Sequence, residues 1–270
     1  MLLAVPNFSE GRDEATLSAI GAAFGPGLIH ASADADHHRA VYTVEGEPGA
    51  LAEKVLAAAR VAVERIDLTR HEGAHPRVGA VDVAPIVHLT AAERGSASAE
   101  ALILADRLGH ELELPVFLYG VLAGGRTRAE LRSGGPEELQ RRIDAGELAP
   151  DAGPRRLHPT AGAVLVAARP PLAAFNVIVD ASLEEAKAIA ATIRQELPGV
   201  RALGLYLERA GIVQVSTNIE DLSATTPADV VAAVRRHATV AAAELVAPAP
   251  RAAFESFPPE IPLHGAPLLG

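Results

Sequence analysis

The sequence predicts an α+β protein made of two modules, each with the element order βαββαβ. Two observations predict this class. Apolar residues recur at helical spacing in some segments, which indicates helices. In shorter segments they alternate with polar residues or form continuous runs, which indicates strands, and the two kinds of segment follow one another along the chain. The same order of segments occurs on either side of Arg169-Pro170-Pro171, without a repeat of the sequence itself. We therefore expect an N-terminal subdomain of residues 1–170 and a C-terminal subdomain of residues 171–270.

The first half begins with an apolar strand and then alternates strands with helices. Asp13 and Glu14 are acidic residues of the kind that favours a helix start, and Pro48 suits the first turn of the second helix. Glycine and proline mark a loop over 69–79. The expected segments are strand 2–6, helix 13–24, strands 28–33 and 40–46, helix 49–65, strand 80–88, helix 96–112, strand 115–119 and helix 136–145.

The second half repeats this order. Ser182, with Glu185 three residues later, matches a capping box, and Pro227 suits the start of the last helix. Prolines recur within 248–270, which predicts an irregular, loosely ordered tail over the surface. The βαββαβ order is the ferredoxin-like pattern, and two such modules side by side would leave a ligand-binding crevice. The expected segments are strand 175–180, helix 183–196, strands 201–208 and 212–217, helix 227–243 and strand 244–246.

Composition and charge narrow the class of protein. Acidic residues number 34 against 24 basic ones, for a formal net charge of −10, and aromatic residues are scarce, so we expect no nucleic-acid partner. The sequence has no membrane-spanning apolar run and no secretory leader, and it lacks cysteine. We therefore expect a cytoplasmic protein without membrane contact, in which local groups of arginines bind anionic ligands.

The segment 71–82, H-E-G-A-H-P-R-V-G-A-V-D, has the greatest chemical content. It contains H-E-x-x-H, the zinc-peptidase pattern, in which both histidines lie on one face of a helix. Gly73 between His71 and His75, and Pro76 directly after, disfavour that helix. We therefore favour a loop that presents a histidine for proton transfer, and we expect no metal site.

Several motifs follow one another in a fixed order. They are V-P-N-F-S-E-G at 5–11, H-R-A-V-Y-T at 38–43 with Gly46, residues 73–82, P-V-F-L-Y-G at 115–120, P-D-A-G-P at 150–154 leading to H-P-T-A-G-A at 158–163, A-A-F-N-V at 173–177 and Q-V-S-T-N at 214–218. In this order they resemble the glutamate formiminotransferase family over nearly the whole chain, in its single-function form without a cyclodeaminase domain.

The resemblance implies two ferredoxin-like subdomains with a ligand tunnel between them. It also implies transfer of the formimino group from N-formimino-L-glutamate to tetrahydrofolate, a co-substrate, in one-carbon metabolism and histidine catabolism; we expect a homodimer and no metal. By motif match, the general acid/base is His75. The implied folate-binding stretch is Gly153, Pro154, Arg155, Arg156, Leu157, His158, Pro159, Thr160, Ala161 and Gly162.

Further polar residues in or beside these motifs are candidates for binding substrate. Arginines suit carboxylates, and amides suit the pterin or the substrate amide, although amides at strand ends also satisfy backbone groups. Ser32 stands where the family uses an aspartate, with Asp34 and Asp36 nearby, and Ala161 stands where some members have tryptophan. The candidates are Asn7, Arg39, Arg77, Asn176, Gln214 and Asn218.

Three alternative functions remain open. A folate-binding protein without turnover is compatible with Ser32, and retention of His75 argues for an enzyme. A related transferase could use another formyl or formimino donor. A zinc peptidase ranks third.

Overall fold

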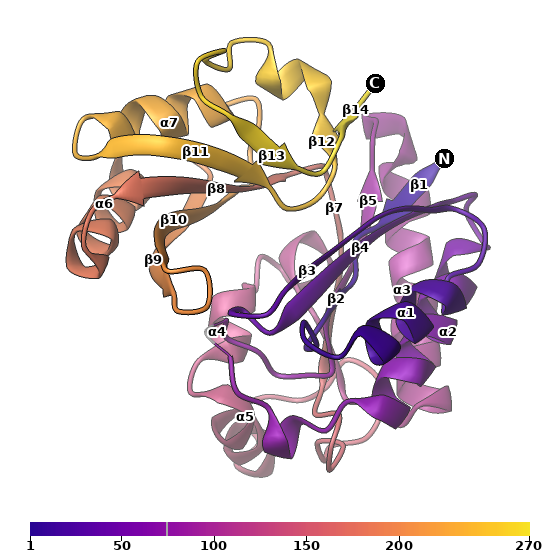
Figure 1. Ribbon diagram of the computed structural model, residues 1–270. Coiled ribbons are helices and arrows are strands. Elements are labelled where there is room, and N and C mark those ends of the chain that lie inside the picture. Colours follow the sequence, from indigo (N-terminus) through magenta and orange to yellow (C-terminus); the bar gives the residue numbers. More distant parts are fainter. Residues whose placement is uncertain (74) are drawn as a thin grey trace. The chain divides into compact units, whose positions relative to one another are not determined.

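The computed structural model describes residues 1–73 and 75–270, and the chain divides into two compact units, Met1–Pro170 and Pro171–Gly270 (Figure 1). Each unit combines a sheet with packed helices, which confirms the α+β class.

One mixed sheet organises the first unit. Collinear β1 and β2 both pair antiparallel with β4 on one side and β5 on the other, and β3 pairs antiparallel with β4. β7 then pairs parallel with β5, and β6 pairs parallel with β7. The strands are β1 (Leu2–Ala4), β2 (Asn7–Phe8), β3 (Leu28–Asp34), β4 (Arg39–Gly46), β5 (Val81–His88), β6 (Val116–Leu118) and β7 (Val164–Arg169).

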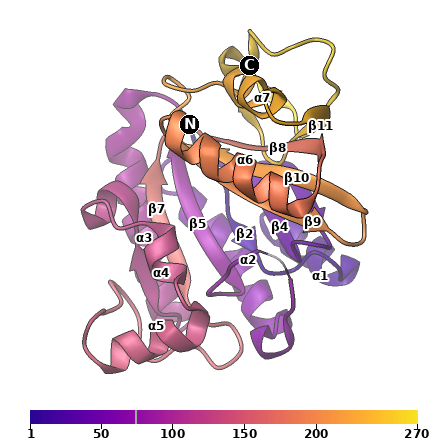
Figure 2. The same cartoon turned by 90° about the vertical axis from the view of Figure 1, so that its left-hand side faces the viewer.

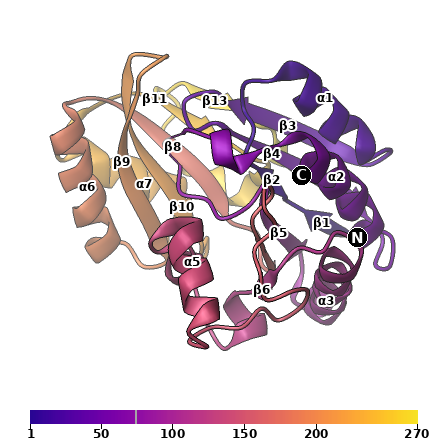
Figure 3. The ribbon, with the colours of Figure 1, turned by 90° about the horizontal axis from the view of Figure 1, so that it is seen from below.

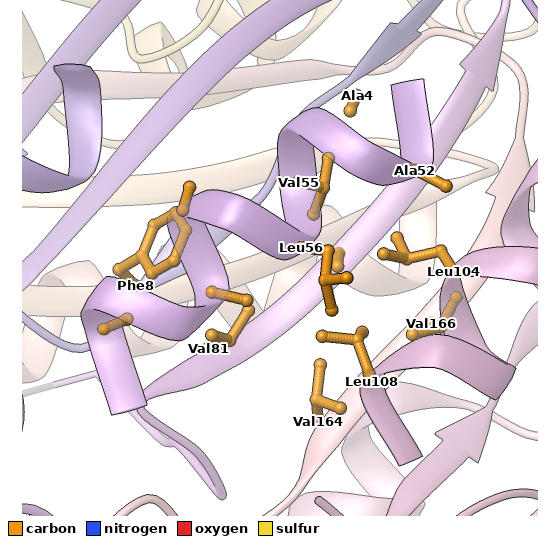
Figure 4. Packing of buried hydrophobic residues seen from close by; sticks show 14 of the residues in the cluster. Ala4, Phe8, Ala52, Val55, Leu56, Val81, Leu104, Leu108, Val164 and Val166 are labelled. Atoms are coloured by element: carbon orange, nitrogen blue, oxygen red, sulfur yellow. The ribbon is translucent and has the colours of Figure 1, made fainter. Parts of the chain in front are cut away.

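Helices cover both faces of this sheet. On one face lie α1 (Glu14–Ala23), α2 (Leu51–Arg65) and α3 (Arg94–Glu111), and on the other lie α4 (Arg128–Arg132) and α5 (Gly135–Asp144) (Figure 3). α2 buries a stripe of apolar residues at helical spacing, and Leu56 from this stripe meets Leu104 and Leu108 of α3 above Val81 and Val164 (Figure 4). Short 3₁₀ turns are η1 (Leu68–Arg70), η2 (Ala91–Glu93) and η3 (Gly120–Ala123).

The second unit has the strand order β13, β11, β8, β10, β9, antiparallel except for the parallel pair of β11 and β13. Its helices α6 (Leu183–Glu196) and α7 (Pro227–Arg235) pack on one face of this sheet (Figure 2). The capping box of Ser182 and Glu185 is confirmed. The strands are β8 (Ala173–Asp180), β9 (Val200–Leu207), β10 (Ile212–Ile219), β11 (Thr239–Leu245), β12 (Ala249–Pro250), β13 (Leu263–Gly265) and β14 (Leu268–Leu269).

Two sequence predictions for the second unit are wrong. α7 ends at Arg235 instead of 243, because Thr239–Leu245 pairs with β8 and β13 as a strand despite its alanines. The tail is ordered: it forms β12, η4 (Arg251–Phe254), β13 and β14, and it buries Phe254 and Ile261 in the core. Strand pairing and apolar burial here override the proline content.

Three predictions for the first unit need smaller corrections. Pro48 lies in the turn before α2, which begins at Leu51, so this proline is not in the first helical turn. The expected strand 2–6 is divided into β1 and β2, with Pro6 between them. α4 and β7 were not predicted, because α4 is one short turn and β7 is an apolar run without alternation. Among residues 1–73 and 75–270, no helix has the length and apolar character of a membrane span.

Substitutions on α3 test the packing of the first unit. Leu104 is 0% exposed and Leu102 is 48% exposed. Leu104→Ala should lower the free energy of unfolding by about 2–5 kcal/mol, because it leaves a cavity between α2 and α3. Leu102→Ala, the matched control, should change it by less than about 0.5 kcal/mol in urea unfolding. Equal losses for the two variants would contradict this packing.

Candidate active site

A β-bulge positions the central carboxylate of the site. Asn7 lies opposite Val83 and Phe8 lies opposite Val81, so Asp82 is an extra residue in β5. Bulges redirect a side chain that strict alternation would place elsewhere. The Asp82 side chain is 0% exposed and meets Arg39 from β4 and Arg132 from α4.

Hydrogen bonds use both oxygens of the Asp82 carboxylate. Oδ2 accepts from Arg39 Nη1 at 2.7 Å and from Arg132 Nη2, and Oδ1 accepts from the Val78 backbone N–H at 2.8 Å. Arg39 Nε also donates to Asn7 Oδ1 at 3.1 Å. Two guanidinium groups thus share one carboxylate, which leaves an excess positive charge in an acidic protein.

The pKa values of these groups follow from burial and charge. Burial disfavours a charged Asp82, but Arg132 and Arg39 outweigh it, so the pKa of this carboxyl stays far below its usual range. Burial, with repulsion from Arg132 and Arg128, lowers the pKa of Arg39 to about 10 although Asp82 opposes it. Asp82 and Arg39 therefore stay charged at neutral pH.

His75 lies beside this charged centre in a single tautomer. Its Nδ1–H donates to the Pro76 carbonyl at 2.7 Å, so Nε2 carries the basic lone pair. Burial, then Arg39 and Arg132, lower the pKa of His75 to about 2, and Asp82 opposes them. The imidazole is therefore neutral at physiological pH and able to accept a proton only at Nε2.

The H-E-x-x-H segment lacks the helix that a zinc-peptidase site requires. η1 ends at Arg70 and β5 begins at Val81, and residues 71–73 and 75–80 lie outside any helix; Ala74, within this motif, lies outside the described residues. Within residues 1–73 and 75–270 there is no group of three or more His, Cys, Asp or Glu side chains that could hold a metal ion. His71 contacts Arg77 through Nδ1, at 2.6 Å.

Both units match one protein family. Residues 1–169 match the formiminotransferase domain, N-terminal subdomain, and residues 174–250 match the formiminotransferase domain. The chain belongs to the formiminotransferase family.

Named relatives differ in how much of their length this chain covers. It is 40% identical over 239 residues to the formimidoyltransferase-cyclodeaminase of Gallus gallus, a match that covers 83% of this chain and 44% of that protein. It is 37% identical over 226 residues to the glutamate formimidoyltransferase of Streptococcus pyogenes serotype M1, covering 80% of this chain and 76% of that protein. It is 33% identical over 234 residues to the glutamate formimidoyltransferase of Thermoplasma acidophilum, a match that covers 82% of this chain and 77% of that protein. The chain thus spans less than half the length of the Gallus gallus relative.

The stretch expected to bind folate consists of residues 153–162. It lies beside the C-terminal end of the loop between η1 and β5, which bears His75 and is called the His75 loop below. Ala161 accepts a backbone hydrogen bond from Ala80 at 2.9 Å, and Gly162 forms a bridge with Gly79. Within the stretch, His158 and Gly162 exchange two backbone hydrogen bonds of 2.9 Å. Two stretches about 80 residues apart in the sequence are thereby held edge to edge in the first unit.

The three amide candidates of the second unit share one face of its sheet. Asn176 on β8 and Gln214 and Asn218 on β10 alternate with residues of the core, so they face away from α6 and α7. Asn176 Nδ2 donates to Glu244 Oε2 of β11 at 3.0 Å. In the first unit, Asn7 and Arg39 belong to the Asp82 centre, whereas Arg77 contacts the His71 ring.

Two residues of this candidate site were not among the sequence candidates. Asp82 had a usable signal, because it is a charged residue inside the apolar strand V-D-V-A-P-I-V. Arg132 had none, because α4 was not predicted and its ion pair with Asp82 spans 50 residues.

Asp82→Asn tests the charged centre. The substitution removes the anion that Arg39 and Arg132 share, and removal of one partner from a buried ion pair costs about 3–5 kcal/mol. Because the folded pKa of Asp82 is lowered, its stabilisation is present above the unfolded pKa and is lost as pH falls. Urea unfolding should show the loss at pH 7 and a smaller one under acid conditions.

The matched control is Asp106→Asn, since that side chain is 70% exposed. It should leave the free energy of unfolding within about 0.5 kcal/mol of wild type. An Asp82→Asn protein as stable as this control would show that the carboxylate is not the anchor of the two arginines.

Proposed function

We propose that the chain transfers the formimino group from N-formimino-L-glutamate to tetrahydrofolate, giving 5-formiminotetrahydrofolate and glutamate. Relatives 33–37% identical are named glutamate formimidoyltransferase, and family domains match both units. One observation in the site carries the proposal: neutral His75, with Nε2 as its basic atom, lies beside a centre with one more arginine than carboxylates.

The excess positive charge suits anionic substrates. N-formiminoglutamate and tetrahydrofolate both carry carboxylates, and guanidinium groups bind carboxylates in charge-assisted pairs. Arg132 Nε–H and the Tyr119 hydroxyl are buried without a hydrogen-bond partner among the described residues. Arg128 Cζ lies 5.7 Å from the Tyr119 ring centre, and the charges of Arg128 and Arg132 both act on Arg39. Such groups are the ones a polar ligand would satisfy.

Binding would also adjust the acid/base group. Arg39 and Arg132 act to lower the pKa of His75, and a substrate carboxylate beside them would offset their charge. The pKa of His75 would then rise from its low value in the unliganded protein, and proton acceptance would become easier once substrate is bound.

The chemistry needs one proton acceptor that later becomes a donor. N5 of tetrahydrofolate attacks the formimino carbon; an N5–C bond forms, and the C=N π electrons move to the imino nitrogen, which takes a proton from water. His75 Nε2 accepts the proton of N5 and returns it to the glutamate nitrogen. The C–N bond to glutamate then breaks, and its electron pair stays on that nitrogen. The lone pair of the former imino nitrogen re-forms the C=N bond, and this nitrogen returns its extra proton to the hydroxide left from water.

The remaining site predictions form part of the proposal. Residues 153–162 would bind the folate, and Asn7, Arg39, Asn176, Gln214 and Asn218 would bind substrate groups. The βαββαβ order and the antiparallel pairing of its strands support a ferredoxin-like assignment for each unit. The ligand tunnel, the homodimer and the cytoplasmic location stay predictions.

His75→Ala tests the reaction and its acid/base group together. The variant should lower kcat for loss of N-formiminoglutamate by about 10²–10⁴-fold, because proton transfer is removed. Tetrahydrofolate binding, followed by calorimetry, should stay within about threefold, because the groups assigned to bind folate are retained. His110→Ala, at a position whose side chain is 74% exposed, is the control and should match wild type.

Normal turnover by His75→Ala would overturn the assignment of this histidine. Tight tetrahydrofolate binding by wild type, without loss of N-formiminoglutamate, would favour a folate-binding protein or a transferase that uses another donor.

A further inference from the structure

His71 has no part in the proton transfers, yet both of its ring nitrogens are engaged. Arg77 Nη1 lies 2.6 Å from Nδ1, and the His38 carbonyl lies 3.2 Å from Nε2. A guanidinium can only donate and a carbonyl can only accept, so Nδ1 is the acceptor and Nε2 carries the hydrogen. The neighbours thus fix His71 as one neutral tautomer.

The position of the His71 ring is fixed from a second direction. The rings of His38 and His71 stack at 3.8 Å with 19° between their planes. His38 is itself held, since its Nε2 lies 3.1 Å from Glu10 Oε1 and its Nδ1 lies 2.8 Å from the Glu72 carbonyl. His71 is therefore a fixed acceptor for Arg77.

Arg77 connects His71 to the loop that bears His75. We call the contacts of Arg77 with His71, Gly73 and His75 the brace. Arg77 Nη2 donates to the carbonyls of Gly73 at 2.9 Å and His75 at 2.6 Å. Nη1 is thus directed to His71 and Nη2 to carbonyls of its own loop, with a longer contact of 3.5 Å from Nη2 to the His37 carbonyl. This differs from the carboxylate-binding role expected for Arg77 from the sequence.

We propose that His71 is a positioning residue that acts through Arg77 to hold the loop in which His75 presents its basic nitrogen to the substrates. The proposal rests on the function proposed above. It gives a role to the first histidine of the H-E-x-x-H pattern that needs neither a helix nor a metal. Arg77 contacts both histidines, the ring of His71 and the backbone carbonyl of His75.

At acid pH, protonation of His71 should break its contact with Arg77. A proton on Nδ1 would remove the acceptor of Arg77 and set two cations 2.6 Å apart. The groups that face His71 are Arg77 from its own loop, His38 from the β3–β4 turn and Glu10 after β2. Burial, then Arg77 and His38, lower the pKa of His71 to about 4, with Glu10 opposing, so the neutral form persists at physiological pH.

Two matched variants separate the acceptor from the stacked ring. His71→Phe keeps an aromatic ring against His38 but lacks the acceptor, whereas His71→Asn places an amide oxygen near the position of Nδ1. His71→Phe should lower kcat about 10–100-fold, with KM for both substrates within about twofold, because a small displacement of the reacting group costs rate more than binding. His71→Asn should keep kcat within about threefold of wild type. Urea unfolding of each variant reports its folded state.

Nitrogen NMR of the His75 ring tests the same proposal without turnover. Wild type and His71→Asn should show a single tautomer with the hydrogen on Nδ1, and His71→Phe should show averaged tautomers. If wild type does not consume N-formiminoglutamate, the proposed function fails, but the ring signal still reports on the brace. A His71→Phe protein with wild-type kcat or an unchanged His75 signal would overturn the proposal.

Arg77→Lys serves as a second variant if His71→Phe does not fold. Its single amine cannot reproduce the fork to the loop carbonyls, so it should reduce kcat and average the His75 signal as His71→Phe does. Wild-type kcat or an unchanged His75 signal in Arg77→Lys would contradict the brace.

Discussion

The buried charge of Asp82 is the constraint on which the rest of the first unit's site depends. A carboxylate that is 0% exposed is tolerated only when cations and hydrogen bonds replace its water. Arg39 must therefore extend from β4, and α4 must lie where Arg132 reaches the same oxygen. Leu131 on α4 is buried in a cluster with Phe117 and Leu165, so apolar packing keeps this short helix against the sheet. Core packing and the ion-pair centre thus support one another.

Burial and the same arginine charges explain why His75 is neutral. The two arginines balance only one carboxylate, and the protein as a whole carries −10, so the positive potential is local and depends on burial. Under the proposed function, the neutral imidazole beside these cations would accept a proton once a substrate carboxylate binds. Arginine suits this centre better than lysine, because Arg39 contacts Asp82 and Asn7 at once through different nitrogens.

Local sequence signals predicted the order of elements, but they could not predict contacts between distant segments. Gly73 and Pro76 correctly indicated that residues 71–73 and 75–80 lie outside any helix, because these two residues act on their own backbone. The last helix was predicted too long, because Thr239–Leu245 has alanine-rich composition and becomes a strand only by pairing with β8 and β13. The bulge at Asp82 depends on its register with Asn7 and Phe8, and the part played by Arg132 depends on a helix too short to show periodicity. These features are properties of tertiary structure.

Backbone contact explains why the loop that bears His75 and the stretch expected to bind folate carry glycine where they meet. A Cβ on Gly79 would lie 1.7 Å from the Ala163 carbonyl oxygen, and one on Gly162 would lie 2.2 Å from that of Val78. Gly162 also has φ +68°, which side chains of L-residues rarely adopt. Val78 is in turn the residue whose N–H binds Asp82. The end of the His75 loop is therefore fixed on one side by the buried carboxylate and on the other by the stretch expected to bind folate, so displacement of either support would also shift the other.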